Sequence, residues 1–150
     1  MNNEKLEEAK RLLKVADHMV YVTFPVLNEN KLLIKITSQI YNALSKASEV
    51  IAERENIFPS KNPFKALNES SQKYGFNSSQ LEILKEILLV MAMHSESPME
   101  FSRREKLIIL SEGLKTEDIT IEKVKSYLTT LKDVINALES KKSFSSLKSN

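Results

Sequence analysis

SPMEFSRREKLIILSEGLKTEDIT, residues 97–120, is the stretch that decides how this chain folds, because it interrupts a sequence that is otherwise typical of long helices. It contains a proline, the adjacent cations Arg103 and Arg104, a short apolar run and Gly113, one of only two glycines in the chain. Proline and glycine are the strongest local signals for a break in regular structure. The stretch therefore separates the last helix from the helices before it.

Two interpretations of this stretch are open. A capping box that starts at Ser102 and a C-terminal cap at Gly113 favour a helix over residues 103–112. Against that helix, the two arginines would lie at the positive end of its dipole, and Leu107–Leu110 contains two adjacent β-branched isoleucines that suit a buried strand. We expect an extended or hairpin-like excursion near residues 105–119 that turns near Gly113.

On both sides of the stretch the apolar residues recur at helical spacing. The first segment places apolar side chains three or four residues apart from Leu6 to Phe24, and Pro25 is expected to end that helix. The pattern resumes over residues 28–55, and the segment from Ile87 to Met93 is apolar all round, which is typical of a helix in the middle of a bundle or under a partner. The other helix boundaries are predicted from caps and breakers, in chain order Asn62 before Pro63, Gly75, Asn77 with Gln80 as its capping-box partner, and Thr120.

These signals predict the fold class. Two glycines and four prolines in 150 residues leave few turn-forming positions, which favours long helices over many short strands. The length is that of one typical domain. We expect a mainly α protein with a single antiparallel bundle of four to five helices over residues 1–138. Residues 139–150 are rich in serine and lysine and are expected to form a polar, frayed tail.

The composition excludes several classes of site. The chain has no cysteine, which removes disulfides, thiol catalysis and thiolate metal ligands, and its two isolated glycines form no phosphate-binding loop. Lysine and arginine (22) exceed aspartate and glutamate (20) by only two, so any basic site must be local. The charged N-terminus is unlike a secretory signal, and the longest apolar run is far shorter than a membrane span. We expect a cytoplasmic protein with no membrane partner, no cofactor and no metal.

Few residues suggest chemistry. The two histidines, His18 and His94, belong to no catalytic or metal-binding motif, and no serine lies in a nucleophile-elbow sequence. His18 follows Asp17 on a polar helix face, which is typical of a solvated pair, and His94 lies where a donor suits the free carbonyls at a helix end. We therefore predict no catalytic residue.

The remaining candidates form a local basic cluster. Arg103, Arg104 and Lys106 follow Phe101 closely, the arginine fork suits phosphate or carboxylate, and an aromatic ring can stack on a base. Solvated charge, or an internal pair with Glu100, is the alternative interpretation of these cations. These four residues are therefore the candidates for contact with an anion or RNA.

The layout over Lys5 to Leu138, long antiparallel helices with a basic connection before the last one, resembles the HEPN helical bundles, a superfamily that includes ribonucleases. HEPN ribonucleases carry an R-x4-6-H motif near a late helix, whose arginine and histidine contact the scissile phosphate. Arg103 and Arg104 lie in the corresponding region but no histidine follows them, while a literal match, Arg11-x6-His18, lies on the first helix. The resemblance therefore implies a non-catalytic or diverged member.

Two functional hypotheses follow. The first is a non-catalytic helical interaction module that associates with itself or a protein partner through an apolar helix face. The second is a HEPN-like protein that binds or cleaves RNA with Arg103 and Arg104, joined by His18 or His94. A metal-dependent enzyme using a histidine and helix carboxylates has the least support.

Overall fold

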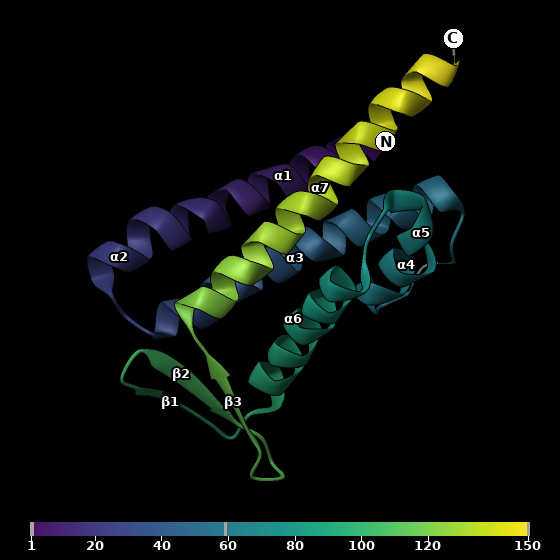
Figure 1. Cartoon of the computed structure of the whole chain (residues 1–150). Helices are drawn as coiled ribbons and strands as arrows, with labels where there is room; N and C mark the ends of the chain where they lie inside the picture. Colours follow the sequence, from purple (N-terminus) through teal and green to yellow (C-terminus); the bar gives the residue numbers. More distant parts are fainter. Residues whose placement is uncertain (1, 59, 150) are drawn as a thin grey trace.

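The computed structural model of the chain describes the backbone of residues 2–58 and 60–149 and the side chains of residues 4–58 and 60–141 (Figure 1). Its helical and strand elements follow one another in the order α1 (Asn2–His18), the π-helix η1 (Met19–Thr23), α2 (Phe24–Leu27), α3 (Lys31–Glu55), α4 (Pro63–Glu69), α5 (Ser71–Tyr74), α6 (Ser78–Glu96), β1 (Met99–Arg103), β2 (Lys106–Leu110), β3 (Thr116–Ile119) and α7 (Ile121–Ser149). The predicted mainly α fold is confirmed.

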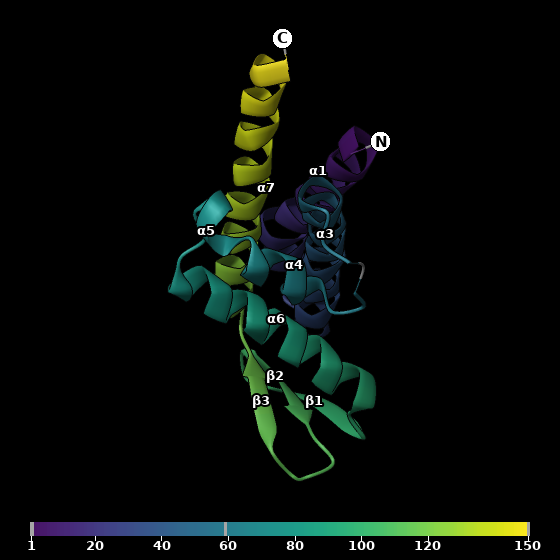
Figure 2. The same cartoon turned by 90° about the vertical axis from the view of Figure 1, so that its right-hand side faces the viewer.

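Three long helices make the body of the molecule. α3 packs against α1 and α7, and α6 lies across the same bundle with the short helices α4 and α5 at one end (Figures 1 and 2). The three-stranded sheet lies at the other end, below the start of α7. If α1, η1 and α2 are taken as one rod, and α4 and α5 as another, the described residues form five helical segments, as the sequence predicts.

The predicted apolar stripes form the core. Every position of the stripe on each of the three long helices is at most 9% exposed. The buried stripe residues are Leu6, Ala9, Leu13, Ala16, Val20 and Phe24 in the first rod, Leu33, Ile36, Ile40, Ala43, Ala47 and Val50 in α3, and Val124, Leu128, Leu131, Ile135 and Leu138 in α7. Helical periodicity in the sequence therefore identified the packed faces correctly.

The predicted caps are confirmed by hydrogen bonds. Asn77 and Gln80 form a reciprocal capping box at the start of α6, with both bonds at 2.8 Å. The Asn62 side chain accepts from the Phe64 amide at 3.0 Å, and the Thr120 hydroxyl accepts from the Lys123 amide at 3.2 Å.

The expectation that Pro25 ends the first helix is wrong. The chain passes from α1 through the π-helical turn η1 into α2, and Pro25 lies in the first turn of α2. A proline is tolerated there because an amide in the first turn has no partner within its own helix. The rod ends instead at Asn28, which adopts a left-handed conformation with φ of 50°.

The interruption before the last helix is a three-stranded antiparallel sheet in the order β1-β2-β3. Leu107, Ile109 and Ile119 point from it into the helical core and are at most 2% exposed. The predicted excursion near residues 105–119 is therefore confirmed, and the alternative helix over residues 103–112 is wrong. A strand buries alternate side chains of this run against the helices, which a helix of the same sequence cannot do. The sheet begins earlier than predicted, at Met99.

A side chain from the helical body holds the tip of the hairpin. The amide nitrogen Nδ2 of Asn30, just before α3, donates to the backbone oxygens of Arg104 at 2.7 Å and Lys106 at 3.1 Å. Asn30 thus links the start of α3 to the tight turn that joins β1 and β2.

The last helix, α7, extends beyond the residues whose side chains are described. The α7 backbone is helical from Ile121 to Ser149, while the side chains of residues 142–150 lie outside the described residues. The boundary at residue 138 and the fraying of residues 139–150 stay predictions. Among the described residues, every helix is too short or too polar to span a membrane.

Replacing Asn30 tests its link to the hairpin. Asn30→Ala removes two hydrogen bonds, so we expect a loss of about 1–2 kcal/mol in the local stability of the hairpin. Amide hydrogen exchange should then speed up roughly tenfold in β1 and β2, while α7 is unchanged. Asn42→Ala, at an exposed position of α3, is the matched control and should leave the exchange unaltered. Equal protection of β1 and β2 in the two variants would contradict the role of Asn30.

Candidate functional site

The candidate site is the outer face of the three-stranded sheet. Because side chains alternate along a strand, the register that pairs Phe101 with Ile108 and Ile108 with Asp118 places these three residues on the same face, opposite the core. Around them lies a surface hollow of about 470 Å³. It is lined by Phe101, Arg103, Arg104, Lys106, Ile108, Thr116 and Asp118.

The fold therefore brings together all four residues that the sequence predicts as anion or RNA contacts. Arg103 ends β1, Lys106 begins β2 in register with it, and Arg104 lies in the two-residue turn between them. Phe101 lies two residues before Arg103 on the same strand face, as the period of two requires. The two-residue turn between β1 and β2 brings these residues together in one cluster.

The charge of the hollow is positive and only partly compensated. Lys106 Nζ lies 3.3 Å from Asp118 Oδ2, across the β2–β3 pair. Arg103 and Arg104 are exposed and form no ion pair with any described residue. Three cations and one carboxylate thus leave a net charge of +2 in the hollow, with both uncompensated guanidinium groups at the turn.

An apolar patch lies beside these cations. Phe101 remains 40% exposed, although its cross-strand neighbour Ile108 is only 8% exposed without belonging to the helical core. Met99, on the same face of β1, is 56% exposed. The Phe101 ring is therefore partly exposed beside the mostly buried Ile108. A partly exposed aromatic ring can stack on another planar ring.

The turn itself holds Arg104 in an unusual backbone conformation. Its φ is +56°, in a position where two-residue hairpin turns prefer glycine. A non-glycine residue there costs on the order of 1 kcal/mol and persists only when its surroundings fix it, as the Asn30 bonds do here. Backbone strain of this kind gathers at binding sites.

The other predicted candidates lie elsewhere. His94 Nδ1 contacts Glu100 Oε2, and Glu100 points to the side of β1 opposite Phe101. The alternative of an internal pair between these cations and Glu100 is therefore wrong, and His94 contacts this carboxylate instead of the free carbonyls at the end of α6. His18 and Arg11 are exposed on α1, and neither they nor His94 line the hollow.

Sequence reasoning missed part of the lining. Ile108, Thr116 and Asp118 reach the hollow only through the pairing of β2 with its neighbours, and Asn30 fixes the turn from a distance of 74 residues in sequence. The signal that was available is the alternation of Met99, Phe101 and Arg103 along one face of a strand.

Outside the sheet, two tyrosines form hydrogen bonds with carboxylates of neighbouring helices. The Tyr127 hydroxyl donates to Glu86 and joins α7 to α6, while Tyr74 donates to Glu55 at 2.9 Å. Burial, reinforced by the adjacent carboxylate, raises the pKa of both tyrosines, that of Tyr74 from 10 to about 12. Burial alone would raise the pKa of Glu55, but hydrogen bonds from Lys73 and Tyr74 outweigh it and lower that pKa. The two tyrosine hydrogen bonds link α7 to α6 and α5 to α3.

The raised tyrosine pKa values predict an alkaline loss of stability. A group whose pKa is higher in the folded state stabilises the fold fully below its unfolded pKa of 10, and that contribution is lost as the pH rises through the folded value. The free energy of unfolding, measured by urea titration, should therefore fall between about pH 10 and 12. The double variant Tyr74→Phe with Tyr127→Phe should have a lower free energy of unfolding at pH 8 than the original protein. Its free energy of unfolding should then decrease less steeply as the pH rises. An equally steep fall in this variant would exclude the tyrosines as its cause.

In comparisons with known proteins, no family model, curated protein or solved structure matches the chain. The relationship to HEPN bundles therefore stays a prediction. The described residues also contain no group of three or more histidines, cysteines or carboxylates arranged to hold a metal ion.

Proposed function

We propose that this protein is a non-catalytic binding module that holds a short segment of single-stranded RNA on the outer face of its sheet. The observation that supports this proposal is the gathering of Phe101, Arg103, Arg104 and Lys106 around one hollow of about 470 Å³. Single-stranded nucleic acids are bound by surfaces that combine backbone-neutralising cations with a stacking aromatic ring. The hollow has both components within one hairpin.

The number of cations sets the scale of the interaction. Two uncompensated arginines and one lysine paired with Asp118 can neutralise two to three phosphates. For single strands the logarithm of the affinity falls with the logarithm of the salt concentration with a slope of roughly −0.7 per phosphate, here about −1.4 to −2.1. Phe101 adds one stacking position, worth about 1–3 kcal/mol per base. The proposed interaction is thus salt-sensitive and covers only a few nucleotides.

The proposed role of this face is to bind RNA without cleaving it. The resemblance to HEPN ribonucleases would require a histidine beside the arginines at the phosphate, and the residues that line the hollow include none. Its one carboxylate, Asp118, is paired with Lys106. The hollow accordingly offers charge, a hydroxyl group from Thr116 and a ring face.

Binding of a fluorescent eight-nucleotide oligouridine, followed by anisotropy, tests the proposal. The affinity should fall roughly 7- to 18-fold between 50 and 200 mM salt. Arg103→Ala with Arg104→Ala should weaken binding and reduce the size of the salt slope by about 1.4. Phe101→Ala should weaken binding by about fivefold or more and leave the salt slope unchanged, because stacking releases no counterions.

The matched control is Arg11→Ala with Lys14→Ala. It removes the same charge from an exposed face of α1 and also disrupts the literal Arg11-x6-His18 match. It should bind as the original protein does. Absence of binding at 50 mM salt, or equal effects of the two double variants, would overturn the proposal for this face.

Self-association is the second candidate function, and a different surface supports it. The apolar segment from Ile87 to Met93 is largely used within the molecule, since Ile87 and Val90 are fully buried and Leu89 is its one large side chain that is more than half exposed among the described residues. The first rod instead carries several exposed apolar residues, which are together called its apolar patch. They are Val15, Tyr21, Val22, Val26 and Leu27, each at least 45% exposed. A second copy of the chain packed on this side of the rod would remove these side chains from water.

Light scattering after size exclusion tests self-association at high micromolar concentration. The original chain should elute with twice its monomer mass of 17.1 kDa. Val22→Glu with Val26→Glu places two charges one helical turn apart on the patch and should yield the monomer. Leu114→Glu, at an 81% exposed position of the β2–β3 turn, is the control and should stay dimeric. A monomeric original chain would exclude the dimer and leave the RNA proposal untouched.

A further inference from the structure

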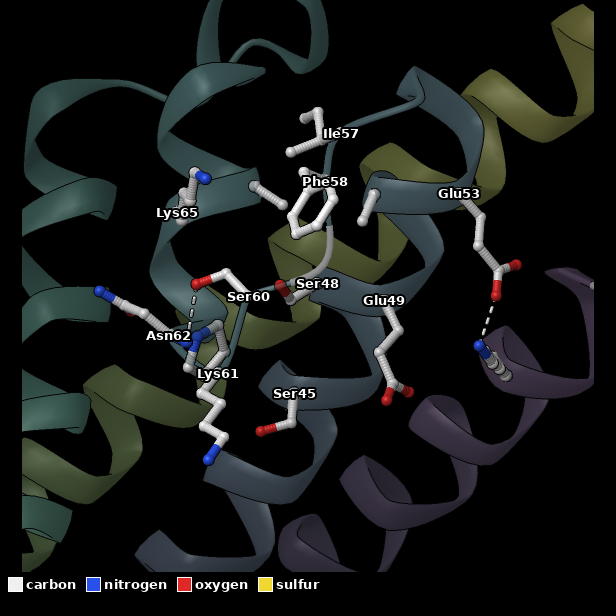
Figure 3. A pocket seen from close by; sticks show the side chains of 14 residues that line it. Ser45, Ser48, Glu49, Glu53, Ile57, Phe58, Ser60, Lys61, Asn62 and Lys65 are labelled. Carbon is white, nitrogen blue, oxygen red and sulfur yellow. Dashed lines mark hydrogen bonds and ion pairs between the residues drawn. The ribbon is translucent and has the colours of Figure 1, made fainter.

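A second cavity lies far from the sheet, between the C-terminal half of α3 and the start of α4 (Figure 3). Its volume is about 370 Å³, within the range of small-molecule sites. The floor is formed by one face of α3, where Ser45, Ser48 and Ala52 are small and leave space. The connection from α3 to α4 contributes Phe58 and Ser60 to the opposite wall.

The floor contains a hydroxyl group that makes no hydrogen bond within the described part of the chain. Ser48 is only 8% exposed, and its side chain lies in the floor of the cavity beneath Phe58 in Figure 3. Its hydroxyl makes no hydrogen bond to any described residue, not even the bond to the preceding helical turn that Thr37 makes to the Leu33 oxygen. The hydroxyl is not sealed off from the cavity, so it is available to a polar atom of a ligand that enters there.

The charges of the cavity are segregated. On the α3 side, Glu53 is paired with Lys5 of α1, and Glu49 lies 3.5 Å from Lys46. On the α4 side, Lys61 and Lys65 are exposed and form no ion pair with any described residue. Lys46 also lies 3.8 Å from Glu8, so it is shared between two carboxylates. The three lysines and two glutamates that line the cavity leave it a net charge of +1, with the two cations that are unpaired among the described residues on the α4 side.

Two further groups suit a particular ligand. The Ser60 oxygen accepts a hydrogen bond from the Asn62 amide at 3.1 Å, which leaves the Ser60 proton available to an acceptor. Phe58, on the same connection, is 82% exposed, so its ring has a free face beside the cavity. Lysines and a hydroxyl donor suit a phosphate group, and a free aromatic face suits a planar ring.

We propose that this cavity binds a small phosphorylated ring compound of the nucleoside monophosphate class. The phosphate group lies against Lys61, Lys65 and Ser60, the ring stacks on Phe58, and a polar atom of the ligand satisfies Ser48. The site is separate from the sheet face in both residues and elements, and its occupancy requires no RNA.

Isothermal titration calorimetry and amide chemical shifts with adenosine 5′-monophosphate test the proposal, with adenosine and inorganic phosphate as the other probes. The monophosphate should bind at least tenfold more tightly than either part, because both ends of the site contribute. Its shifts should concentrate in residues 45–66. Binding of inorganic phosphate as tight as that of the monophosphate, or shifts confined to the sheet, would overturn the proposal.

Variants assign the contacts. Lys61→Ala with Lys65→Ala should weaken monophosphate binding by about tenfold or more, and Ser48→Ala and Phe58→Ala by about fivefold each. The lysines and Phe58 are exposed, so these variants should fold normally, which thermal unfolding checks. Lys31→Ala with Lys35→Ala, at exposed positions near the other end of α3, is the charge-matched control and should bind within twofold of the original.

The two proposed sites are distinguished by testing the variants of each site for binding of the other site's ligand. Arg103→Ala with Arg104→Ala should leave monophosphate binding unchanged, and Lys61→Ala with Lys65→Ala should leave oligouridine binding unchanged. Loss of monophosphate binding in the arginine variant would overturn the cavity site. Loss of oligouridine binding in that variant alone is the result expected for the sheet face and does not bear on the cavity.

Discussion

The burial of α3 is the constraint on which the rest of this structure depends. Its buried residues form one wide face along the whole helix, and α3 contacts α1, α4, α6, α7 and β2. A helix with so wide a buried face packs against several neighbours at once, because each apolar side chain left in water would lose the free energy of hydrophobic burial. Buried alanines occur in both α3 (Ala43 and Ala47) and α1 (Ala9 and Ala16), and such small side chains let two neighbouring helices approach closely. The other helices are arranged around this one.

The same constraint explains the sheet. Once α1, α6 and α7 surround α3, its N-terminal end remains to be covered, and the chain between α6 and α7 is the segment available there. This end is covered by the side chains of Leu107, Ile109 and Ile119. Because side chains alternate along a strand, only every second residue points toward the helices. The intervening side chains must face outward, so the cluster of Phe101, Arg103 and Lys106 on the outer face follows from how the inner face is used.

Sequence analysis predicted what depends on local patterns. The stripe of α7 and the capping box of Asn77 and Gln80 were correct because each depends on residues within one or two helical turns. The start of β1 was missed because this strand buries little and reads as a polar segment of five residues. The contact of Asn30 with Arg104 spans 74 residues, and the burial of Ser48 depends on the packing of α4. No local pattern encodes such contacts, so the position of a candidate residue was predictable while its surroundings were not.

The two surfaces argued to bind ligands lie near opposite ends of α3. Asn30, which precedes the helix, holds the hairpin turn, and Ala52 lines the cavity six turns later. Coupling between such sites requires an element with two arrangements that both ligands favour unequally. α3 is one continuous helix from Lys31 to Glu55, with a packed face along its whole length, and a packed helix is a rigid spacer. The fold therefore favours two independent contact surfaces held at a fixed separation, and a partner that spans both would gain affinity from that fixed geometry.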